Sequence, residues 1–376
     1  MIDVAPIRAF LDERHLALAA RSFAAPRDPT DDAAARAQAR ELVGRLGASG
    51  WFQAIADQDW RACCLARETL AAASPLADAV FALQALGTVP ILLSTNHAMR
   101  ERWALPALTG QAMASFAMTE PEAGSDVASL AATARKDGAA GYVLTGTKTF
   151  ISNAGIADFY TVFATTDPAR GGKAIACFVV PADTPGLRFV KPLVLSAPHP
   201  LGEIAFEEAR VPAACLLAAE GDGYKLGLAT LDRLRATVGA AACGMAGRAL
   251  HEAVAHARTR RQFGKPLGDF QIIQEKVARM ATELTAARLL VYRAAWEKDR
   301  GAERVTAEAA MAKAFATEAA QRIVDDAVQI LGGRGVLADH PVDRLYRSVR
   351  ALRIYEGTTE IQHLIIAGQL LGAATR

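Results

Sequence analysis

Two segments in the middle of the chain combine residue types that could hold a cofactor. The turn-rich loop 116–126 contains hydroxyl groups, carboxylates and glycine, which can line a polar ligand with side-chain and backbone donors. An ordinary surface loop with Asx-type turns would have the same composition. In the strand-like segment 146–153, alternation places Phe150 and Ser152 on one face. An aromatic ring beside a hydroxyl suits an isoalloxazine ring, and it equally suits ordinary sheet packing.

A third segment, 354–362, places a carboxylate in a glycine-containing loop just before a predicted helix. Thr359 and Gln362 have the spacing of a capping box, so we expect a helix to begin there. Glu356 could then act as a general base, and Gly357 would allow a substrate to approach the backbone closely. The alternative is a solvated loop glutamate with no chemical role.

The periodicity of the chain changes twice and defines the elements that must position these segments. The pattern is helical to about residue 112, alternating and β-branched from 115 to 212, and helical again after 223. We therefore predict an α+β multidomain fold: an N-terminal all-α domain (1–114), a middle antiparallel β domain (115–215) and a C-terminal four-helix-bundle domain (216–376). The expected strands are 142–145, 147–152, 159–164, 175–180 and 204–206, and the expected helices include 33–46, 224–258, 270–299, 304–331 and 359–371.

The composition excludes several classes of protein. The 376 residues carry 42 basic and 40 acidic side chains without a long run of like charges, which argues against nucleic-acid binding. A hydrophobic content of 52% excludes disorder. The uncharged stretch 79–99 is long enough to cross a membrane, but its polar residues and Pro90 predict two buried helices, broken near the proline. The first residues lack the pattern of a targeting leader, so we expect a cytoplasmic protein.

Three further patterns do not support a metal or dinucleotide site. The five cysteines lack C-x-x-C spacing, so neither disulfides nor a zinc site is predicted. His251 and His256 are five residues apart on a predicted helix and therefore point to different faces. The glycines Gly221, Gly223 and Gly227 miss the dinucleotide fingerprint by one residue, and no strand of a βαβ unit precedes them.

Taken together, these segments resemble the motifs of the acyl-CoA dehydrogenases, FAD enzymes that introduce an α,β double bond into an acyl-CoA thioester. The resemblance covers essentially the whole chain to Leu371, with the motifs in the expected order. It implies that Glu356 is the catalytic base. It also implies that FAD is bound by Phe116, Met118, Thr119, Gly124, Ser125, Phe150, Ile151, Ser152, Thr358 and Glu360.

The resemblance further implies binding of CoA and of a neighbouring subunit. Asp232 and Arg235 occupy positions that contact pantetheine and nucleotide, and Ser125 and Gly357 are expected at the substrate. A second set of residues resembles the elements that reach the FAD of a neighbouring subunit: Arg260, Phe263, Gln271, Gln329, Gly332 and Gly333. We therefore expect a homotetramer, a dimer of dimers, with electron-transferring flavoprotein as the electron acceptor.

By the same resemblance, Glu356 takes the α-proton of the thioester while the β-hydrogen leaves as hydride to flavin N5. The Glu356 backbone N–H and a flavin ribityl hydroxyl would bind the thioester carbonyl oxygen and stabilise the developing enolate. Some members carry the base immediately before the arginine equivalent to Arg235, where this chain has Leu234. The resemblance therefore assigns the base to Glu356 alone.

Three places depart from the family pattern. Phe150 stands where many relatives have tryptophan, and Ser348 replaces a common acidic residue. The segment 193–202, which contains His199, replaces a Lys-Met-Gly-type segment; His199 could face the site or be a loop residue. No Lys or Arg occurs between residues 69 and 99, so we expect a neutral acyl chain rather than a dicarboxylic one. A flavin oxidase, a carrier-protein-linked dehydrogenase and a non-catalytic flavin-binding relative remain as alternatives.

Overall fold

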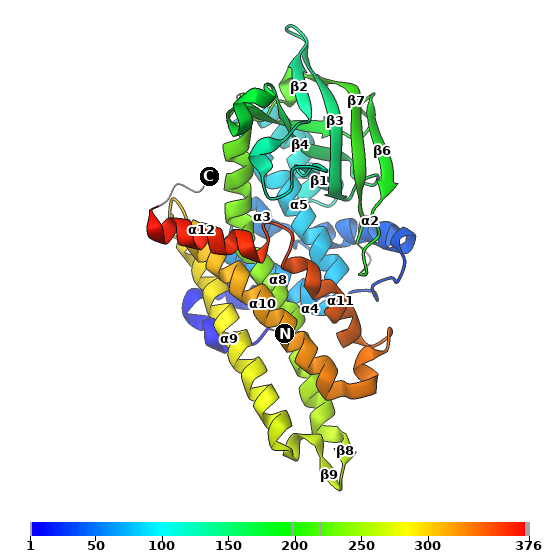
Figure 1. Ribbon diagram of the computed structural model, residues 1–376, viewed down its shortest axis with the longest axis vertical. Coiled ribbons are helices and arrows are strands. Elements are labelled where there is room, and N and C mark those ends of the chain that lie inside the picture. Colours follow the sequence, from blue (N-terminus) through cyan, green and yellow to red (C-terminus); the bar gives the residue numbers. More distant parts are fainter. Residues whose placement is uncertain (1, 198, 219, 373–376) are drawn as a thin grey trace. The chain divides into compact units, whose positions relative to one another are not determined.

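The computed structural model describes residues 2–197, 199–218 and 220–372 (Figure 1). The chain forms two compact units, each assembled from separated stretches. The helical unit consists of Met1–Arg27, Gln58–Asp78 and Asp232–Arg376, and the sheet unit consists of Asp28–Asp57 and Ala79–Leu231. Two helices, α5 (Pro75–Leu93) and α8 (Gly223–Thr259), contribute residues to both units. The predicted domain limits at 114 and 215 follow the order of the chain and stay a prediction.

The sheet unit contains a seven-stranded sheet in the order β1-β4-β2-β3-β7-β6, with β5 paired to β4. Its strands are β1 (Ala114–Ala117), β2 (Thr133–Lys136), β3 (Gly141–Ser152), β4 (Phe159–Thr165), β5 (Ile175–Pro181), β6 (Leu187–Pro192) and β7 (Leu201–Pro212). The predicted β region is confirmed, and most strand pairs are antiparallel. The exceptions are β1 and β2, which pair with β4 in parallel. Strand β4 is buried along its whole length, as its apolar and aromatic residues require.

Helices of the sheet unit hold the ends of the strands. They are α2 (Asp32–Ala48), α3 (Gln53–Ala56), α6 (His97–Met99), α7 (Leu105–Leu108) and most of α5. Helix α2 begins where Asp31 accepts the backbone N–H of Ala34 at 2.8 Å. Farther along α2, Arg40 forms an ion pair with Asp158 at 2.6 Å, next to the start of β4. These contacts tie α2 to the end of the sheet that carries residues 152–158.

Helix α5 runs through Pro90 without a break, so the predicted interruption near this proline is wrong. Pro90 lacks the N–H that would bond the carbonyl oxygen four residues earlier, and three helical residues follow it. Within the turn that the proline disturbs, Thr161 Oγ1 donates to the Gly87 carbonyl oxygen at 2.7 Å. The helix is long and apolar enough to cross a membrane, but 89% of its apolar window is buried, as in a core helix.

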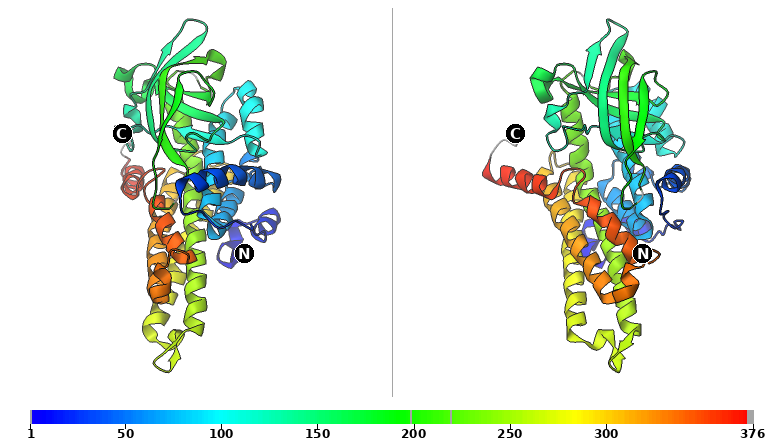
Figure 2. Two further views of the ribbon diagram at one scale, coloured as in Figure 1. Left: turned by 90° about the vertical axis from the view of Figure 1, so that its right-hand side faces the viewer. Right: turned by 45° about the vertical axis from the view of Figure 1, so that its right-hand side comes forward.

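The helical unit is a bundle of long helices with shorter ones packed on it. Its helices are α1 (Glu13–Ala19), α4 (Trp60–Ala73), α9 (Gln271–Asp299), α10 (Thr306–Leu331), α11 (Pro341–Leu352), α12 (Thr359–Leu371) and most of α8. Helices α9, α11 and α12 all pack against α10. A small hairpin, β8 (Arg261–Gln262) and β9 (Lys265–Pro266), joins α8 to α9 and projects beyond the helix ends (Figure 2). The predicted long helices are confirmed, whereas α11 was not predicted.

A close helix contact and a buried polar network fix this bundle. A Cβ atom on Gly244 of α8 would lie 2.2 Å from the Glu68 carbonyl oxygen of α4, so only glycine allows this approach. The buried Glu68 carboxylate receives hydrogen bonds from Arg288 Nε at 2.7 Å and from Tyr292 Oη at 2.8 Å, both on α9. Because both carboxylate oxygens of Glu68 are paired, the network stabilises the bundle without leaving an unsatisfied charge.

Candidate active site

Glu356 lies in the short loop that joins α11 to α12 (Figure 1). Its backbone is left-handed, with φ of 54°, and Gly357 continues the turn with φ of 90°. Helix α12 is capped by Thr358, whose side chain accepts the N–H of Ile361, so the prediction that Thr359 caps the helix is one residue late. A non-glycine residue held with positive φ is strained and needs support from its surroundings.

Glu318 of α10 supplies that support at both ends of the loop. Its Oε1 atom accepts hydrogen bonds from Arg353 Nε and from Thr359 Oγ1, each at 2.7 Å. The Thr359 hydroxyl therefore faces α10 instead of capping its own helix. One carboxylate thus closes the loop between residues 353 and 359.

Lys313 and Gln362 hold the middle of the same loop. Lys313 Nζ donates to the Gly357 carbonyl oxygen at 2.6 Å, and Gln362 Nε2 donates to the same oxygen at 2.9 Å. Gln362 Nε2 also lies 3.2 Å from the Glu356 carbonyl oxygen. Both side chains are fully buried. Burial lowers the pKa of Lys313 to about 8, while the charge of Glu356 acts in the opposite direction.

The Glu356 carboxyl group occupies a buried environment with three nearby cations. Its Oε2 atom is shielded from solvent and has no hydrogen-bond partner among the residues that the structure describes. Burial raises the pKa of this carboxyl group above its ordinary value, and the charges of Arg67, Lys313 and Arg235 oppose the rise. Arg67 is itself bound to both Asp78 oxygens at 2.8 and 2.9 Å, so part of its charge is already neutralised. The result is a carboxylate that can exchange a proton and is not locked in an ion pair.

Arg235 and Asp232 on α8 add two more unsatisfied polar atoms. Arg235 Nε and Asp232 Oδ1 are buried without a hydrogen-bond partner, and the two side chains are 3.8 Å apart at their nearest charged atoms. Burial lowers the pKa of Arg235. Buried donors and acceptors are rarely left unpaired in folded proteins, so these atoms indicate where a polar ligand would bind. Asp232, Arg235, Glu356 and Gly357 all belong to the helical unit.

In the sheet unit, a buried ion pair holds the loop 118–126 against β3. Lys148 Nζ donates to Glu120 Oε1 at 2.6 Å and to the Met118 carbonyl oxygen at 3.0 Å. Glu120 also accepts the backbone N–H groups of Ala131 and Ala132. Burial lowers the pKa of Lys148 to about 8, although the neighbouring Glu120 raises it. The hydrogen bonds of Lys148 hold the loop at Met118 and Glu120 and do not involve its later residues.

The predicted cofactor residues of the sheet unit surround this pair. Phe116 lies on β1, Met118 is buried, Thr119 is half-buried, and Gly124 and Ser125 are exposed in the loop. Nothing lies within 4 Å of a Cβ atom built on Gly124. The exposed end of the loop therefore presents backbone and hydroxyl groups to solvent.

The end of β3 presents an aromatic ring and a hydroxyl group. Phe150 is 62% exposed and has φ of 53°, and a β-bulge interrupts the pairing of β3 with β7 between Lys148 and Ile151. Ile151 is buried, while Ser152 is half-buried. The alternation in the sequence did not indicate the bulge or the left-handed residue. A large aromatic side chain held exposed in a strained conformation indicates a surface that a ligand covers.

The residues predicted to reach a neighbouring subunit lie together at one end of the bundle. Phe263 is 93% exposed at the tip of the β8–β9 hairpin, with φ of 50°. Arg260, Gln271, Gln329, Gly332 and Gly333 are exposed at the adjoining helix ends. Burial and the charges of Arg334 and Arg260 lower the pKa of His256, which lies near the end of α8. Of the remaining predicted residues, Thr358 caps α12 and Glu360 is exposed in its first turn.

His199 lies within hydrogen-bonding distance of Ser152, with Nε2 and Oγ 2.7 Å apart. The sequence left open whether this histidine faces the site or belongs to an ordinary loop. Within the atypical segment 193–202, Pro198 lies outside the described residues.

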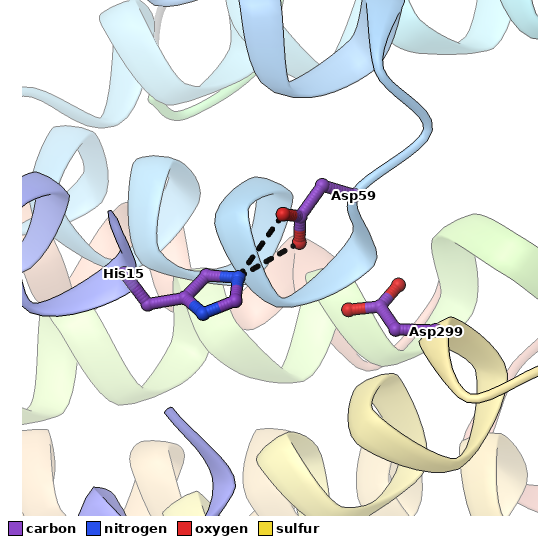
Figure 3. Close-up of side chains that lie close together, drawn as sticks. All are labelled: His15, Asp59 and Asp299. Atoms are coloured by element: carbon purple, nitrogen blue, oxygen red, sulfur yellow. Dashed lines mark hydrogen bonds and ion pairs between the residues drawn. The ribbon is translucent and has the colours of Figure 1, made fainter. Parts of the chain in front are cut away.

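A second cluster of titratable groups, formed by His15, Asp59 and Asp299, resembles a metal site by proximity (Figure 3). His15 Nε2 lies 3.0 and 3.1 Å from the two Asp59 oxygens, and Figure 3 shows its ring directed at that carboxylate. His15 Nδ1 accepts the Asp12 N–H, which makes Nε2 the donor. Asp299 is occupied by the Trp60 backbone N–H and by Arg61. Because these oxygens already accept protein hydrogen bonds, the cluster ties α1, α4 and α9 together as a structural network.

Sequence reasoning missed Arg67, Lys313, Glu318, Lys148 and Glu120. Each is a charged residue in or beside an apolar stretch of the sequence, and this difference in polarity could have identified them. Lys313, for example, is the single basic residue of the alanine-rich run 307–316. A fully buried lysine requires a partner, so its presence there predicted a polar contact in the core.

Comparisons with known proteins agree with this arrangement. Residues 115–209 match the family described as "Acyl-CoA dehydrogenase, middle domain" and residues 221–371 match "Acyl-CoA dehydrogenase, C-terminal domain". A "3-(aryl)acrylate reductase" of Clostridium sporogenes is 40% identical over 343 residues, covering 88% of this chain and 90% of the relative.

Two solved structures resemble the whole chain. Butyryl-CoA dehydrogenase from Megasphaera elsdenii aligns with a TM-score of 0.86 and 34% identity over 99% of both chains. A chain from a structure titled for the electron transferring flavoprotein of Acidaminococcus fermentans aligns with a TM-score of 0.84 and 32% identity, covering 92% of this chain and 100% of that one. Because these matches span most of the sequence, this chain belongs to the acyl-CoA dehydrogenase family of flavin-dependent oxidoreductases.

Proposed function

We propose that the protein catalyses FAD-dependent α,β-dehydrogenation of an acyl-CoA thioester to the trans-2-enoyl-CoA, with Glu356 as the base. The observation that carries this proposal is the buried Glu356 Oε2 atom, which has no hydrogen-bond partner among the described residues and lies in a loop that α10 holds in place. A carboxylate that only stabilised the fold would have its oxygens paired, as those of Glu120 and Glu68 are.

The residues of the chain fit FAD. The exposed Phe150 ring can cover one face of a flat aromatic cofactor, and the hydroxyls of Thr119, Ser125 and Ser152 can accept or donate hydrogen bonds to its polar groups. The exposed backbone at Gly124 offers room for phosphate groups. When bound, FAD supplies the acceptor for the hydride that leaves the β-carbon.

The protein's own contribution is to take the α-proton and to stabilise the negative charge that develops. Burial raises the pKa of Glu356, which makes its carboxylate a stronger base than an exposed glutamate. The positive charges of Arg67, Lys313 and Arg235, which limit the rise in the pKa of Glu356, would also stabilise the negative charge of the enolate. The hydrogen bonds to the Gly357 carbonyl oxygen keep the loop from moving during proton transfer.

We propose that Asp232 and Arg235 bind the CoA part of the substrate, because their buried Oδ1 and Nε atoms have no hydrogen-bond partner among the described residues. The acyl chain is neutral in this proposal. Arg67 is the nearest cation before the stretch 69–99, which contains no Lys or Arg, and Asp78 accepts two hydrogen bonds from it. A distal carboxylate on the substrate would therefore find no free cation at Arg67.

We also propose a cytoplasmic homotetramer that passes its electrons to an electron-transferring flavoprotein. Phe263 is 93% exposed on a projecting hairpin, and Ile272 is 73% exposed at the start of α9, which follows this hairpin; apolar side chains exposed close together support coverage by another subunit. The likeness to a chain from a structure titled for an electron transferring flavoprotein supports the acceptor.

A second candidate is the reverse reaction, reduction of an acrylate-type double bond. The likeness to a "3-(aryl)acrylate reductase" favours it, since this relative is 40% identical to the chain. One reaction removes a proton and a hydride from two adjacent carbon atoms and the other adds them back, so the direction depends on the substrate and the electron partner.

The test is an anaerobic titration of the purified flavoprotein with a panel of acyl-CoA esters, followed at about 450 nm. We expect bleaching by a neutral acyl-CoA, and loss of this bleaching in Glu356→Gln. Glu41→Gln is the matched control, because Glu41 is 65% exposed on α2. Reoxidation of the dithionite-reduced protein by an aryl acrylate, with no bleaching by any acyl-CoA, would support the second candidate. Full bleaching in Glu356→Gln would exclude Glu356 as the base.

A further inference from the structure

The segment that departs from the family pattern is held against the end of β3 by the backbone. The Asn153 N–H donates to the Pro200 carbonyl oxygen at 2.8 Å, and Ser152 pairs with Leu201 in the β3–β7 register. His199 therefore precedes the paired residues by one position and is held beside Ser152 by the strand register.

Arg36 of α2 clamps the same two strands. Its NH1 group donates to the Ala154 carbonyl oxygen at 2.6 Å, its NH2 group donates to the Leu201 carbonyl oxygen at 2.5 Å, and its Nε atom binds Asp32 at 2.6 Å. The Arg36 guanidinium group thus binds Ala154, two residues after the end of β3, and Leu201, the first residue of β7. All of these contacts lie within the sheet unit.

Within this rigid frame, the His199 ring contacts the Ser152 hydroxyl, with 2.7 Å between Nε2 and Oγ. The Ser152 backbone cannot move freely, because its carbonyl oxygen also accepts from Ser115 Oγ at 2.6 Å. The direction of the Ser152 hydroxyl group can still vary, and its hydrogen bond with the imidazole ring limits this variation. Burial and the charge of Arg36 lower the pKa of His199 to about 4, so the ring is neutral near pH 7.

A neutral imidazole suits this task better than a charged one. It carries one donor and one acceptor nitrogen, so it can either accept the Ser152 hydrogen or donate its own. A charged ring would only donate and would add a positive charge beside the end of β3.

We propose that His199 is a positioning residue that orients the Ser152 hydroxyl toward the bound flavin ring. This inference rests on the proposed function for the identity of the ligand that Ser152 contacts. It assigns a role to one residue of the atypical segment: His199 acts on the ligand through the serine.

The experiment is a double-mutant cycle on FAD affinity, measured by flavin fluorescence during reconstitution of the flavin-free protein. We expect Ser152→Ala and His199→Asn each to weaken binding about threefold to tenfold, as loss of one hydrogen bond would. The double variant should bind FAD no more weakly than the weaker-binding of the two single variants. His199→Gln, which can place a polar atom near the position of Nε2, should restore affinity to within about twofold, whereas His199→Asn cannot reach Ser152.

Two further measurements separate positioning from a loss of folding. The 450 nm band of bound flavin should change shape in His199→Asn and recover in His199→Gln. His251→Ala, an exposed histidine on α8, is the control and should behave as wild type. Multiplicative effects in the cycle, or an unchanged affinity in His199→Asn, would overturn the inference. If acyl-CoA bleaches the wild type but the cycle shows no coupling, only this inference fails; coupling without bleaching leaves it standing and removes the proposed function.

Discussion

Two fully buried lysines, one in each unit, show how similar groups serve different purposes. Lys148 and Lys313 are both completely shielded, and burial lowers the pKa of each to about 8. Lys148 binds the Glu120 carboxylate directly at 2.6 Å, and Glu120 accepts two further backbone hydrogen bonds. Lys313 instead binds the Gly357 carbonyl oxygen, and the neighbouring Glu356 keeps an unpaired oxygen.

The difference separates a structural pair from a reactive one. A carboxylate whose hydrogen-bonding capacity is filled within the protein has little left for a substrate. A carboxylate near a lysine whose ammonium group binds another acceptor is stabilised by the positive charge, and its oxygen remains available to take a proton. The backbone carbonyl of Gly357 is therefore what keeps Lys313 near Glu356 without closing an ion pair.

The largest expected effect is on catalysis, in Glu356→Gln. We expect kcat to fall about 10³-fold, within the usual range for loss of a general base. The free energy of unfolding should change by less than about 1 kcal/mol, because the removed charge had no partner. Steady-state kinetics and urea unfolding of the same preparation measure both quantities. If Glu356→Gln lost as much free energy of unfolding as removal of a paired carboxylate, this contrast between the two lysine sites would be contradicted.

The structural pair should respond in the opposite way. Lys148→Met leaves Glu120 buried without its cation, and we expect a loss of about 3–5 kcal/mol in the free energy of unfolding. Urea unfolding measures this loss, and Lys173→Met serves as a control at an exposed lysine of the same unit. Equal stability of the two variants would show that the buried pair does not hold the loop 118–126.

Lys313→Met sharpens the comparison at the reactive site. Removing this cation raises the pKa of Glu356, because one of the charges that opposes burial is lost. The acidic limb of the kcat/KM profile should move to higher pH, and activity at pH 6 should fall about fivefold relative to activity at pH 8. A pH-independent loss would indicate that Lys313 acts only by holding the loop.

A further prediction concerns the paired cluster in the helical unit. Burial opposes ionisation of Asp59, but hydrogen bonds from His15 and the Ala62 N–H lower its pKa to about 2. An acid whose pKa is lowered in the folded state stabilises the protein above its unfolded pKa, near 3.9, and loses this contribution as the pH falls through about 2.

We therefore expect wild type to lose about 1–2 kcal/mol more stability than Asp59→Asn between pH 5 and pH 2. The difference between the two proteins isolates Asp59 from Asp299, whose pKa burial raises and which therefore contributes with opposite sign. Parallel curves of unfolding free energy against pH would show that Asp59 is not the titrating group.

The sequence predicted the elements that have strong periodicity. Helices α8, α9, α10 and α12 lie within a few residues of their predicted limits, because long amphipathic or apolar runs leave few alternatives. Strands β1 and β2 have four residues each and were missed because so short a run shows no alternation. Strand β6 was missed because it is largely exposed and carries charges, so neither face reads as core.

The candidate site was predictable only in part. Glu356 and the loop 116–126 follow from local motifs and the family resemblance. Lys313, Glu318 and Arg67 come from distant positions, and no spacing in the sequence relates them to Glu356. The same holds for Pro90 and for the Thr358 cap, where packing decided between local alternatives of similar cost.

The double hydrogen bond to Glu318 also determines how the loop can open. Because a single carboxylate oxygen accepts from Arg353 and from Thr359, releasing either end leaves the other still attached to α10. The loop then cannot fray gradually as a chain end does, and its amide hydrogens exchange with solvent through a cooperative opening. The residues that would take a proton from the substrate thus share the lifetime of the surrounding helices rather than that of a surface loop.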